Sequence, residues 1–550
     1  MQPQRGEGQR QPRAIGPQPG GVGGGEARPD DDDDECGDRQ RSRGWSTLHE
    51  NAIFPLMPTD PILRPAARRA IILLLCLMAG PLAGCASPAG SPAGAARQAP
   101  PDAAGATEIR AGAAVRVFTP EVGPGASPVR IAGFGQGRDA TGVHDDLTAR
   151  ALVIETGGAT VALVALDLIG FFHDDVVKIR QEVRDRHPDV AVPSILIAST
   201  HTHAGPDVIG LWSPPERRVD PAYIARIRSA AADAVAEAWS RRRPARLSFA
   251  SVDVPDLIHD SRLPEVIDPT AFLMRVEGAA AGGEPIATLL SFPSHPESLG
   301  RTNTLISADY PWAARLVLEK EFGGVALFFS GDLGGMLTPS GVSMTDPRTG
   351  EAMTAGTPRA TQVYGEVLGR RVVDAWRSGA VAAPADGRLE ILDRAIDVPL
   401  ANERFRAGLR SGQIWPRAIA PDGGLESEVA VLTVRGAAPD TEPLAQFACM
   451  PGEIYPELVV GGIQSPQDPG ADVQGAALER PLRGMMRGRF RPVLGLCNDE
   501  LGYIIPRSEW DETAPWAYGR TGPQYGEINS TGAMAAPTIL GAFAAMLGAN

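Results

Sequence analysis

Histidines, a glutamate and a tyrosine are the residues of this chain whose types and spacing could do chemistry. His201 and His203 stand two positions apart, so on an extended segment both imidazoles project from the same side. Together with His295, Glu453 and Tyr503 they offer the nitrogen and oxygen ligands that a catalytic zinc ion uses, with room left for a water. Such a metal lowers the pKa of that water to about 7 and polarises a carbonyl oxygen. The pattern therefore predicts a hydrolytic metal centre.

An isolated His-x-His pair can also cap a strand without binding anything, so its surroundings decide between the two interpretations. Each candidate follows a short apolar run that stops abruptly at glycine, proline or polar residues. These runs cover residues 161–166, 195–198, 287–292, 325–329, 444–450 and 493–496, and they end at Asp167, the histidine pair, His295, Asp332, Glu453 and near Tyr503. Sheets covered by helices place their sites in loops beyond the carboxyl ends of the strands. The repeated coincidence favours a metal site.

Apolar runs of this length suit strands that are buried on both faces. Helices are expected over residues 173–187, 223–240 and 361–376. We therefore expect an α/β fold in which mixed or mostly parallel buried sheets are flanked by helices, within a single large catalytic domain over residues 109–550.

Composition excludes several classes of protein. The chain has 550 residues, of which 43% are hydrophobic and 21% charged, which is ordinary globular usage. A formal net charge of −14 argues against a nucleic-acid-binding surface. The chain has no Gly-x-Ser-x-Gly elbow, no His-Glu-x-x-His helix and no P-loop, which disfavours a serine hydrolase, a thermolysin-like peptidase and an NTPase.

The first 108 residues carry signals of export. Residues 1–56 are polar and rich in glycine, and we expect them to be disordered and to precede the true start at Met57. Residues 57–84 have the basic, apolar and small-residue regions of a signal peptide, and their end resembles a bacterial lipoprotein signal that would lipidate Cys85. The alternative is a buried helix with an incidental cysteine. Residues 85–108 would be a flexible tether, which predicts a protein anchored by lipid in the bacterial cell envelope, or secreted. In an oxidising compartment Cys449 and Cys497 could form a disulfide, which the sequence leaves open.

The segment around the histidine pair resembles a signature of the neutral, alkaline, non-lysosomal ceramidases. It reads Ser199-Thr200-His201-Thr202-His203-Ala204-Gly205-Pro206. Further segments resemble the same family: Ile131-Ala132-Gly133-Phe134-Gly135, Val143-His144-Asp145-Asp146-Leu147, Pro293-Ser294-His295-Pro296, Ile306-Ser307-Ala308-Asp309-Tyr310, Met450-Pro451-Gly452-Glu453 and Gly502-Tyr503-Ile504-Ile505-Pro506. The family also carries a C-terminal immunoglobulin-like domain, and the resemblance here covers the catalytic domain alone, over residues 109–550.

The resemblance implies a role for each candidate residue. The zinc ligands would be His201, His295, Glu453 and Tyr503, with His203 beside the metal and oriented toward the substrate or the attacking water. Arg262 resembles the family's active-site arginine, which stabilises oxyanion charge. The alternatives are a surface role for Arg262 and a core role for Tyr503.

One departure from the family bears on activity. Gly334 falls at the place of the family's active-site serine, and Thr338 is the nearest hydroxyl. A zinc-activated water could still act as the nucleophile.

The sequence thus predicts a zinc-dependent hydrolase that cleaves an N-acyl amide in a ceramide-like lipid, with His203 or Glu453 in proton movement. Trp212 would either line the acyl-chain entrance or pack within its loop. An esterase or a non-sphingoid amidase on the same site is one alternative, and a non-catalytic, lipid-anchored binding protein is another. The sequence does not indicate an oligomeric state.

Overall fold

The computed structural model describes residues 108–156, 158–280, 282–384, 387–436, 438 and 441–549. The predicted disordered start, the signal peptide, the lipidated Cys85 and nearly all of the tether lie outside these residues. Within the described part of the chain, no helix is both long and apolar enough to cross a membrane.

The largest element is a mixed sheet of nine strands. Its order is β11 (Val325–Ser330), β9 (Pro285–Phe292), β8 (Thr270–Gly278), β6 (Arg243–Asp253), β1 (Arg110–Val117), β3 (Thr148–Thr156), β4 (Ala159–Leu166) and β5 (Ser194–Ser199), with β15 (Val381–Ala382) paired to β6. The outermost pairs, β11 with β9 and β4 with β5, are parallel, whereas the pairs between them are antiparallel. The mixed sheet predicted from the sequence is confirmed.

A second, four-stranded sheet packs against both halves of the large sheet, and the three share one buried core. The halves meet at β1 and β6, where only Ala111 with Arg243 and Arg110 with Pro244 are paired. The second sheet has the order β16 (Arg388–Val398), β17 (Leu425–Arg435), β18 (Ala445–Cys449) and β20 (Val493–Leu494). Leu163 of one half, Phe272 of the other and Phe447 of the second sheet belong to a single buried cluster. The inner face of the nine-stranded sheet is therefore covered by the strands of the second sheet.

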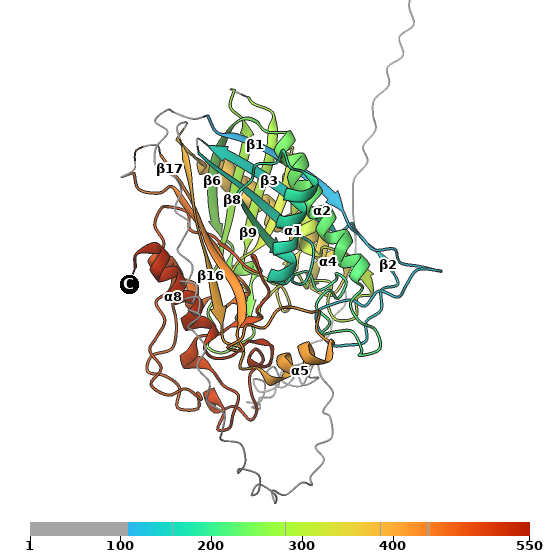
Figure 1. The fold of residues 1–550 in the computed structure, drawn as a ribbon, viewed down its shortest axis with the longest axis vertical. Helices are drawn as coiled ribbons and strands as arrows, with labels where there is room; N and C mark the ends of the chain where they lie inside the picture. The colour runs from blue at the N-terminus through green and yellow to red at the C-terminus, as the bar shows by residue number, and fades with distance from the viewer. Residues whose placement is uncertain are drawn as a thin grey trace, which may run out of the picture. The chain divides into compact units, whose positions relative to one another are not determined.

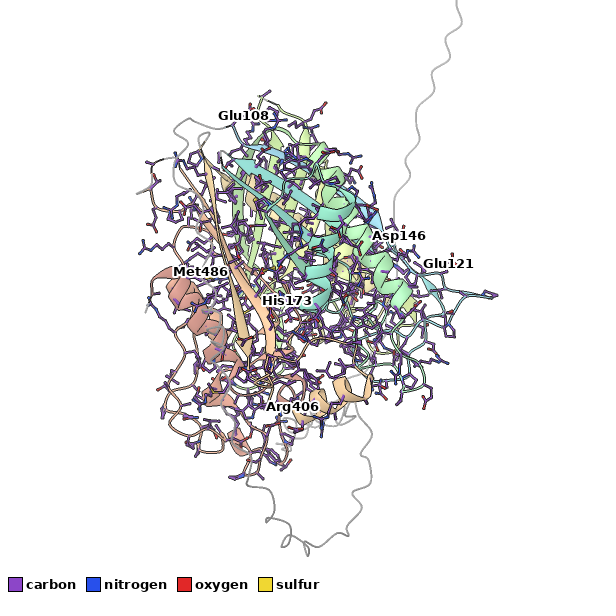
Figure 2. The ribbon with its side chains drawn as sticks, in the orientation of Figure 1. Glu108, Glu121, Asp146, His173, Arg406 and Met486 are labelled. Carbon is purple, nitrogen blue, oxygen red and sulfur yellow. A yellow bond between two sulfur atoms is a disulfide. The ribbon has the colours of Figure 1, made fainter. Side chains whose placement is uncertain are left out.

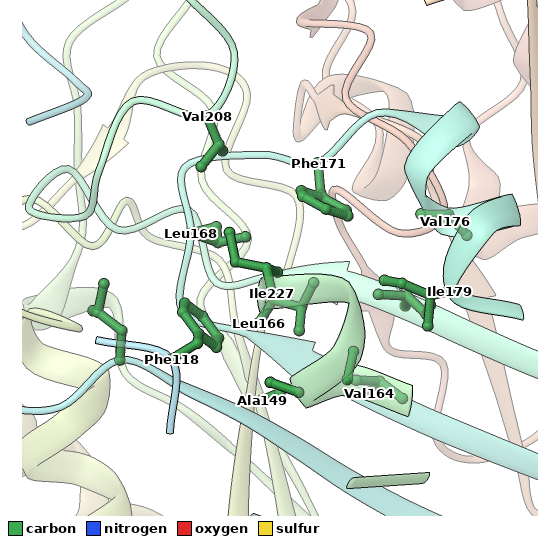
Figure 3. Close-up of a cluster of buried hydrophobic side chains, with 14 of the residues drawn as sticks. Phe118, Ala149, Val164, Leu166, Leu168, Phe171, Val176, Ile179, Val208 and Ile227 are labelled. Atoms are coloured by element: carbon green, nitrogen blue, oxygen red, sulfur yellow. The ribbon is translucent and has the colours of Figure 1, made fainter. Parts of the chain in front are cut away.

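Helices cover the outer faces of the strands, as predicted. Helices α1 (His173–Arg186) and α2 (Pro221–Ser240) pack on β1, β3 and β4, and Val176 and Ile179 of α1 belong to the same buried cluster as Val164 of β4 (Figure 3). Helices α3 (Tyr310–Phe322) and α4 (Pro358–Gly379) pack on β8, β9 and β11. Helix α8 (Ala535–Leu547) packs on the second sheet, on the side away from α1 and α2 (Figure 1). The strands and helices predicted from the apolar runs agree with β4, β5, β9, β11, β18, β20, α1, α2 and α4 within a few residues.

Local sequence explains where the long helices begin. Asp220 caps α2 by accepting a hydrogen bond from the Ala222 amide, and Pro221 stands at the first helical position. Thr357 and Pro358 begin α4 in the same way.

The remaining elements are short. They are β2 (Gly142–Val143), β7 (His259–Asp260), β10 (Leu305–Ile306), β12 (Leu337–Thr338), β13 (Ser343–Thr345), β14 (Ala352–Thr354), β19 (Glu453–Ile454), β21 (Tyr503–Ile504), α5 (Glu403–Ser411), α6 (Glu457–Val460), α7 (Leu482–Met485) and single 3₁₀ turns at Pro255–Leu257, Arg507–Glu509, Ala517–Gly519 and Glu527–Asn529.

Candidate metal centre

His201 follows β5 in a conformation that few non-glycine residues adopt. Its φ is +66°, in the left-handed region, which costs of the order of 1 kcal/mol or more. The surrounding loop holds it there, because its backbone amide donates to the Leu168 carbonyl at 2.8 Å. The ring nitrogen Nδ1 lies 2.5 Å from the Ile169 carbonyl oxygen and must donate to it. The neutral imidazole therefore keeps its lone pair on Nε2, which is the arrangement of a metal-ligating histidine.

His295 follows β9 and is oriented by the same device. Its Nδ1 donates to the Leu337 carbonyl at 2.8 Å, so its Nε2 is also free to bind a cation. The Nε2 atom lies 3.1 Å from Oε2 of Glu453. That carboxylate oxygen is also 3.3 Å from Nε2 of His201.

Glu453 enters the site through a two-residue parallel pairing. Strand β19 pairs with β21, and Glu453 is the register partner of Tyr503. A disulfide joins Cys449, the last residue of β18, to Cys497, with 5.2 Å between their Cα atoms. The bond that the sequence left open is therefore formed in the structure.

The donor atoms form one compact group. One ring nitrogen each of His201, His203 and His295 lie within 4.8 Å of one another, and His201 forms a second such group with Glu453 and Glu500. Nitrogen and carboxylate donors at this spacing fit zinc, and both histidine tautomers are already set for it.

Burial and pairing set the charges at this centre. Burial opposes a charged His201, but the charge and hydrogen bond of Glu453 raise its pKa above the ordinary value. Burial also opposes an ionised Glu453, but His201 and His295 lower its pKa below the usual range. Burial lowers the pKa of His203 to about 4, against the effect of Glu297. His203 is therefore a neutral imidazole at pH 7, which is the form that binds metals.

An apolar cavity adjoins the histidine cluster. Besides His201, His203 and Glu453, its wall is mostly hydrophobic: Phe134, Ile169, Phe172, Ile209, Leu211, Trp212, Leu400, Phe405, Leu409, Ile414, Leu425 and Leu501. Trp212 takes both of the roles considered for it, because it lines the cavity and its Nε1 donates to the Phe134 carbonyl at 3.0 Å. Phe405 and Leu409 come from α5, which carries Arg406 in Figure 2. This arrangement places an apolar binding space directly beside the candidate metal ligands.

Tyr503, Thr338 and Arg262 occupy three different positions. Tyr503 lines the cavity, and its hydroxyl donates to the Met336 sulfur at 3.7 Å. The Thr338 hydroxyl donates to Oε1 of Glu297 at 2.5 Å. Arg262 is buried away from the cavity wall, where Glu527 binds it through two hydrogen bonds of 2.7 and 3.0 Å. The Arg262 guanidinium is therefore paired with Glu527 and does not line the cavity beside the histidine cluster.

The backbone explains why no serine stands at position 334. A Cβ atom added to Gly334 would lie 2.3 Å from the Glu453 carbonyl oxygen and 2.5 Å from the Ile454 carbonyl carbon. The strand that carries Glu453 therefore fills the space that a side chain at 334 would need.

Two acidic residues of the site were missed from the sequence. Oε2 of Glu297 faces Nδ1 of His203 at 3.3 Å. Glu500 accepts a hydrogen bond from the Gly502 amide, lines the cavity and leaves its Oε2 without a hydrogen-bond partner. Burial and the charge of Glu453 raise the pKa of Glu500 well above its ordinary value. A signal existed for Glu297, which stands two residues after His295 and so on the same side of an extended segment.

The first half of this domain is similar to a known protein family. Residues 122–339 match the family model described as neutral/alkaline non-lysosomal ceramidase, N-terminal. The predicted resemblance to this family is confirmed. His201, His203 and His295 lie inside the matched residues, whereas Glu453 and Tyr503 lie beyond them. The match supports assignment of the chain as a hydrolase.

Solved structures show the same fold. The neutral ceramidase from Pseudomonas aeruginosa aligns with a TM-score of 0.58 and 16% sequence identity, covering 80% of this chain and 73% of that chain. A ceramidase complexed with C2 aligns with the same score and identity, covering 80% and 74%. A search of curated proteins finds no match.

Proposed function

We propose that this protein is a zinc-dependent hydrolase that cleaves the N-acyl amide bond of a ceramide-like lipid. The observation that carries the proposal is the convergence of His201, His295 and Glu453 beside an apolar cavity. The family match over residues 122–339 supports the same reaction class.

The chain's own residues supply binding, orientation and charge. The apolar wall, including Phe172 and Leu425, would take up an acyl chain and exclude water from the site. The carbonyls of Ile169 and Leu337 fix the two imidazoles, and the Glu453 carboxylate offsets the charge of a bound cation. A zinc ion bound there supplies Lewis acidity, which polarises an amide carbonyl and acidifies a water.

An esterase or a non-sphingoid amidase on the same site is the second candidate. The observation that favours it is Gly334, whose surroundings exclude the serine of the ceramidase family. We also propose that Cys85 anchors the protein by lipid to the cell envelope, on the basis of its signal-like sequence.

Metal content and a substrate panel test the proposal. We expect about one zinc per chain by elemental analysis, and little zinc in His201→Ala and His295→Ala. His187→Ala is the matched control, because His187 pairs with Asp233 at the end of α1 and is remote from the cavity wall. Wild-type protein that folds without metal would favour the binding-protein alternative.

The panel then separates the hydrolases. Ceramide, an N-acyl amide without a sphingoid base, and an ester with the same acyl chain are compared at equal concentration. Preference for ceramide supports the proposal, whereas preference for the ester or the simple amide supports the second candidate.

A further inference from the structure

Two segments that are far apart in the chain contribute to the cavity wall and are joined to each other. Residues 207–213, which follow the histidine pair, form the first segment, and residues 405–417, which begin within α5, form the second. The side chains that line the cavity are Ile209, Leu211 and Trp212 from the first segment and Phe405, Leu409, Ile414 and Arg417 from the second. The contacts that join these two segments therefore fix this side of the cavity.

The carboxylate of Asp207 organises the first segment. Asp207 is buried, with 7% of its surface exposed. Its Oδ1 accepts hydrogen bonds from the amides of Ile209 and Gly210 at 3.1 and 2.7 Å. Its Oδ2 accepts from the amides of Trp212 and Ser213 at 3.0 and 2.8 Å. Four backbone donors thus converge on one side chain, and hydrogen bonds to a carboxylate are stronger than those between neutral groups.

The Gln413 side chain joins the first segment to the second. Its Nε2 donates to the carbonyls of Gly210 and Ser213 at 2.9 and 2.6 Å. The amides of the first segment are therefore bound by Asp207, whereas two of its carbonyls are bound by the second segment. All of these backbone groups belong to buried residues, which need such partners because water does not reach them.

The two backbones also touch directly. Gly210 has a φ of +94°, and a Cβ atom there would lie 2.1 Å from the Gln413 carbonyl oxygen, so this approach requires glycine. The Trp415 amide donates to the Ile209 carbonyl at 2.7 Å. The Trp415 indole in turn donates to Asp175 of α1 at 2.6 Å, which fixes the second segment to the helix. The wall is therefore held on both sides by groups of the protein itself.

We propose that Asp207 and Gln413 are positioning residues that fix the cavity wall and so determine how strongly the site selects for the length of an acyl chain. Neither of them lines the cavity, so they act through Ile209, Leu211 and Trp212. A wall held in one arrangement contacts each added methylene of a chain, whereas a wall that is free to move loses part of these contacts. This inference rests on the proposed function, since it concerns the apolar cavity of the same site.

Binding of straight-chain fatty alcohols tests the proposal without relying on activity. These neutral probes cannot be hydrolysed, and their affinity for the full chain is measured by isothermal titration calorimetry as the alcohol is lengthened. Burial of one methylene corresponds to roughly a fourfold gain in affinity, and we expect the wild type to approach this increment. We expect Asp207→Ala and Gln413→Ala to reduce the increment to about twofold or less, because the loosened wall no longer follows the chain.

A conservative variant and a matched control separate positioning from unfolding. Gln413→Glu replaces the amide donor with an acceptor of the same shape, and it should reduce the increment as Gln413→Ala does. Asp422→Ala removes an exposed aspartate that follows the second segment and does not line the cavity, and it should leave the increment unchanged. Circular dichroism confirms that each variant is folded, and the two Gln413 variants decide the question if Asp207→Ala is not. A wild-type increment in the folded variants would overturn the proposal.

The outcome also separates this inference from the proposed function. If the wild-type chain shows the increment but cleaves no amide, the proposed reaction fails and the positioning role stands. If it cleaves ceramide but the increment does not depend on Asp207 or Gln413, only the positioning role fails. If it binds none of the alcohols, the cavity does not hold an acyl chain and this inference fails.

Discussion

Gly334 is the residue at which this chain departs most clearly from the ceramidase signature, and it can be tested directly. A serine there would press its Cβ against the backbone of Glu453 and Ile454, at separations of 2.3 and 2.5 Å before relaxation. Overpacking of this kind costs about 1–3 kcal/mol, and it would displace the strand that carries Glu453. We expect Gly334→Ser to lower the free energy of unfolding by that amount in urea titrations and to weaken zinc binding. The control is Gly522→Ser, because no atom lies within 4 Å of an added Cβ there. Equal stability of the two variants would show that the loop adapts.

At the scale of single residues, the sequence predicts the site residues that follow the buried strands, but not the side chains that contact them. His201, His295 and Glu453 were predicted because an apolar run precedes each of them, and the structure brings them together. Arg262 was assigned from a local motif, yet its surroundings depend on Glu527, which lies 265 residues away in the chain. Glu297 was missed although it stands two residues after His295, because its contacts with the Thr338 hydroxyl and with the His203 ring join segments that are far apart in the chain.

Helix α5 contributes two apolar side chains to the wall of the cavity. Asn402 caps it by accepting from the amides of Arg404 and Phe405, and Gly412 ends it with a φ of +71°. Phe405 and Leu409 are four residues apart on one face and both line the cavity. We expect Leu409→Ala to remove about 1–2 kcal/mol of apolar contact with a long acyl chain. KM should therefore rise roughly 5- to 30-fold with kcat little changed, and zinc content should stay constant.

Chain-length dependence distinguishes substrate contact from a folding defect in this variant. The rise in KM should shrink with short acyl chains, which do not reach α5. Arg404→Ala, on the exposed side of the helix, is the matched control and should leave KM unaltered. A KM effect that is independent of chain length would place Leu409 outside the substrate space.

At the scale of elements, the apolar runs predicted the parallel strands and the main helices, while the antiparallel strands were largely missed. The sequence of β16 mixes polar and apolar residues along its length, and most of its side chains are half-buried or exposed. It therefore lacks the continuous apolar run that identified β4 and β11. The two halves of the large sheet are joined by the two residue pairs between β1 and β6, and no local sequence pattern predicts this pairing.

The whole molecule buries several carboxyl groups, and this predicts how its stability depends on pH. Burial raises the pKa of Glu509 from 4.5 to about 7, although the Gln464 amide and Arg262 oppose the shift. The folded protein then binds more protons than the unfolded chain between about pH 4.5 and 7, so the free energy of unfolding falls as the pH rises through that range. Asp260 and Asp309 act in the same direction, because burial raises their pKa values to about 7 and about 6. The glutamine in Glu509→Gln cannot titrate. The slope of its unfolding free energy against pH should therefore be smaller than that of the wild type, by an amount that corresponds to up to about one bound proton.

Urea unfolding at pH 5, 6, 7 and 8 measures the slopes, with Glu284→Gln as a control at an exposed glutamate. Parallel curves for Glu509→Gln and wild type would mean that Glu509 titrates as it does in the unfolded chain.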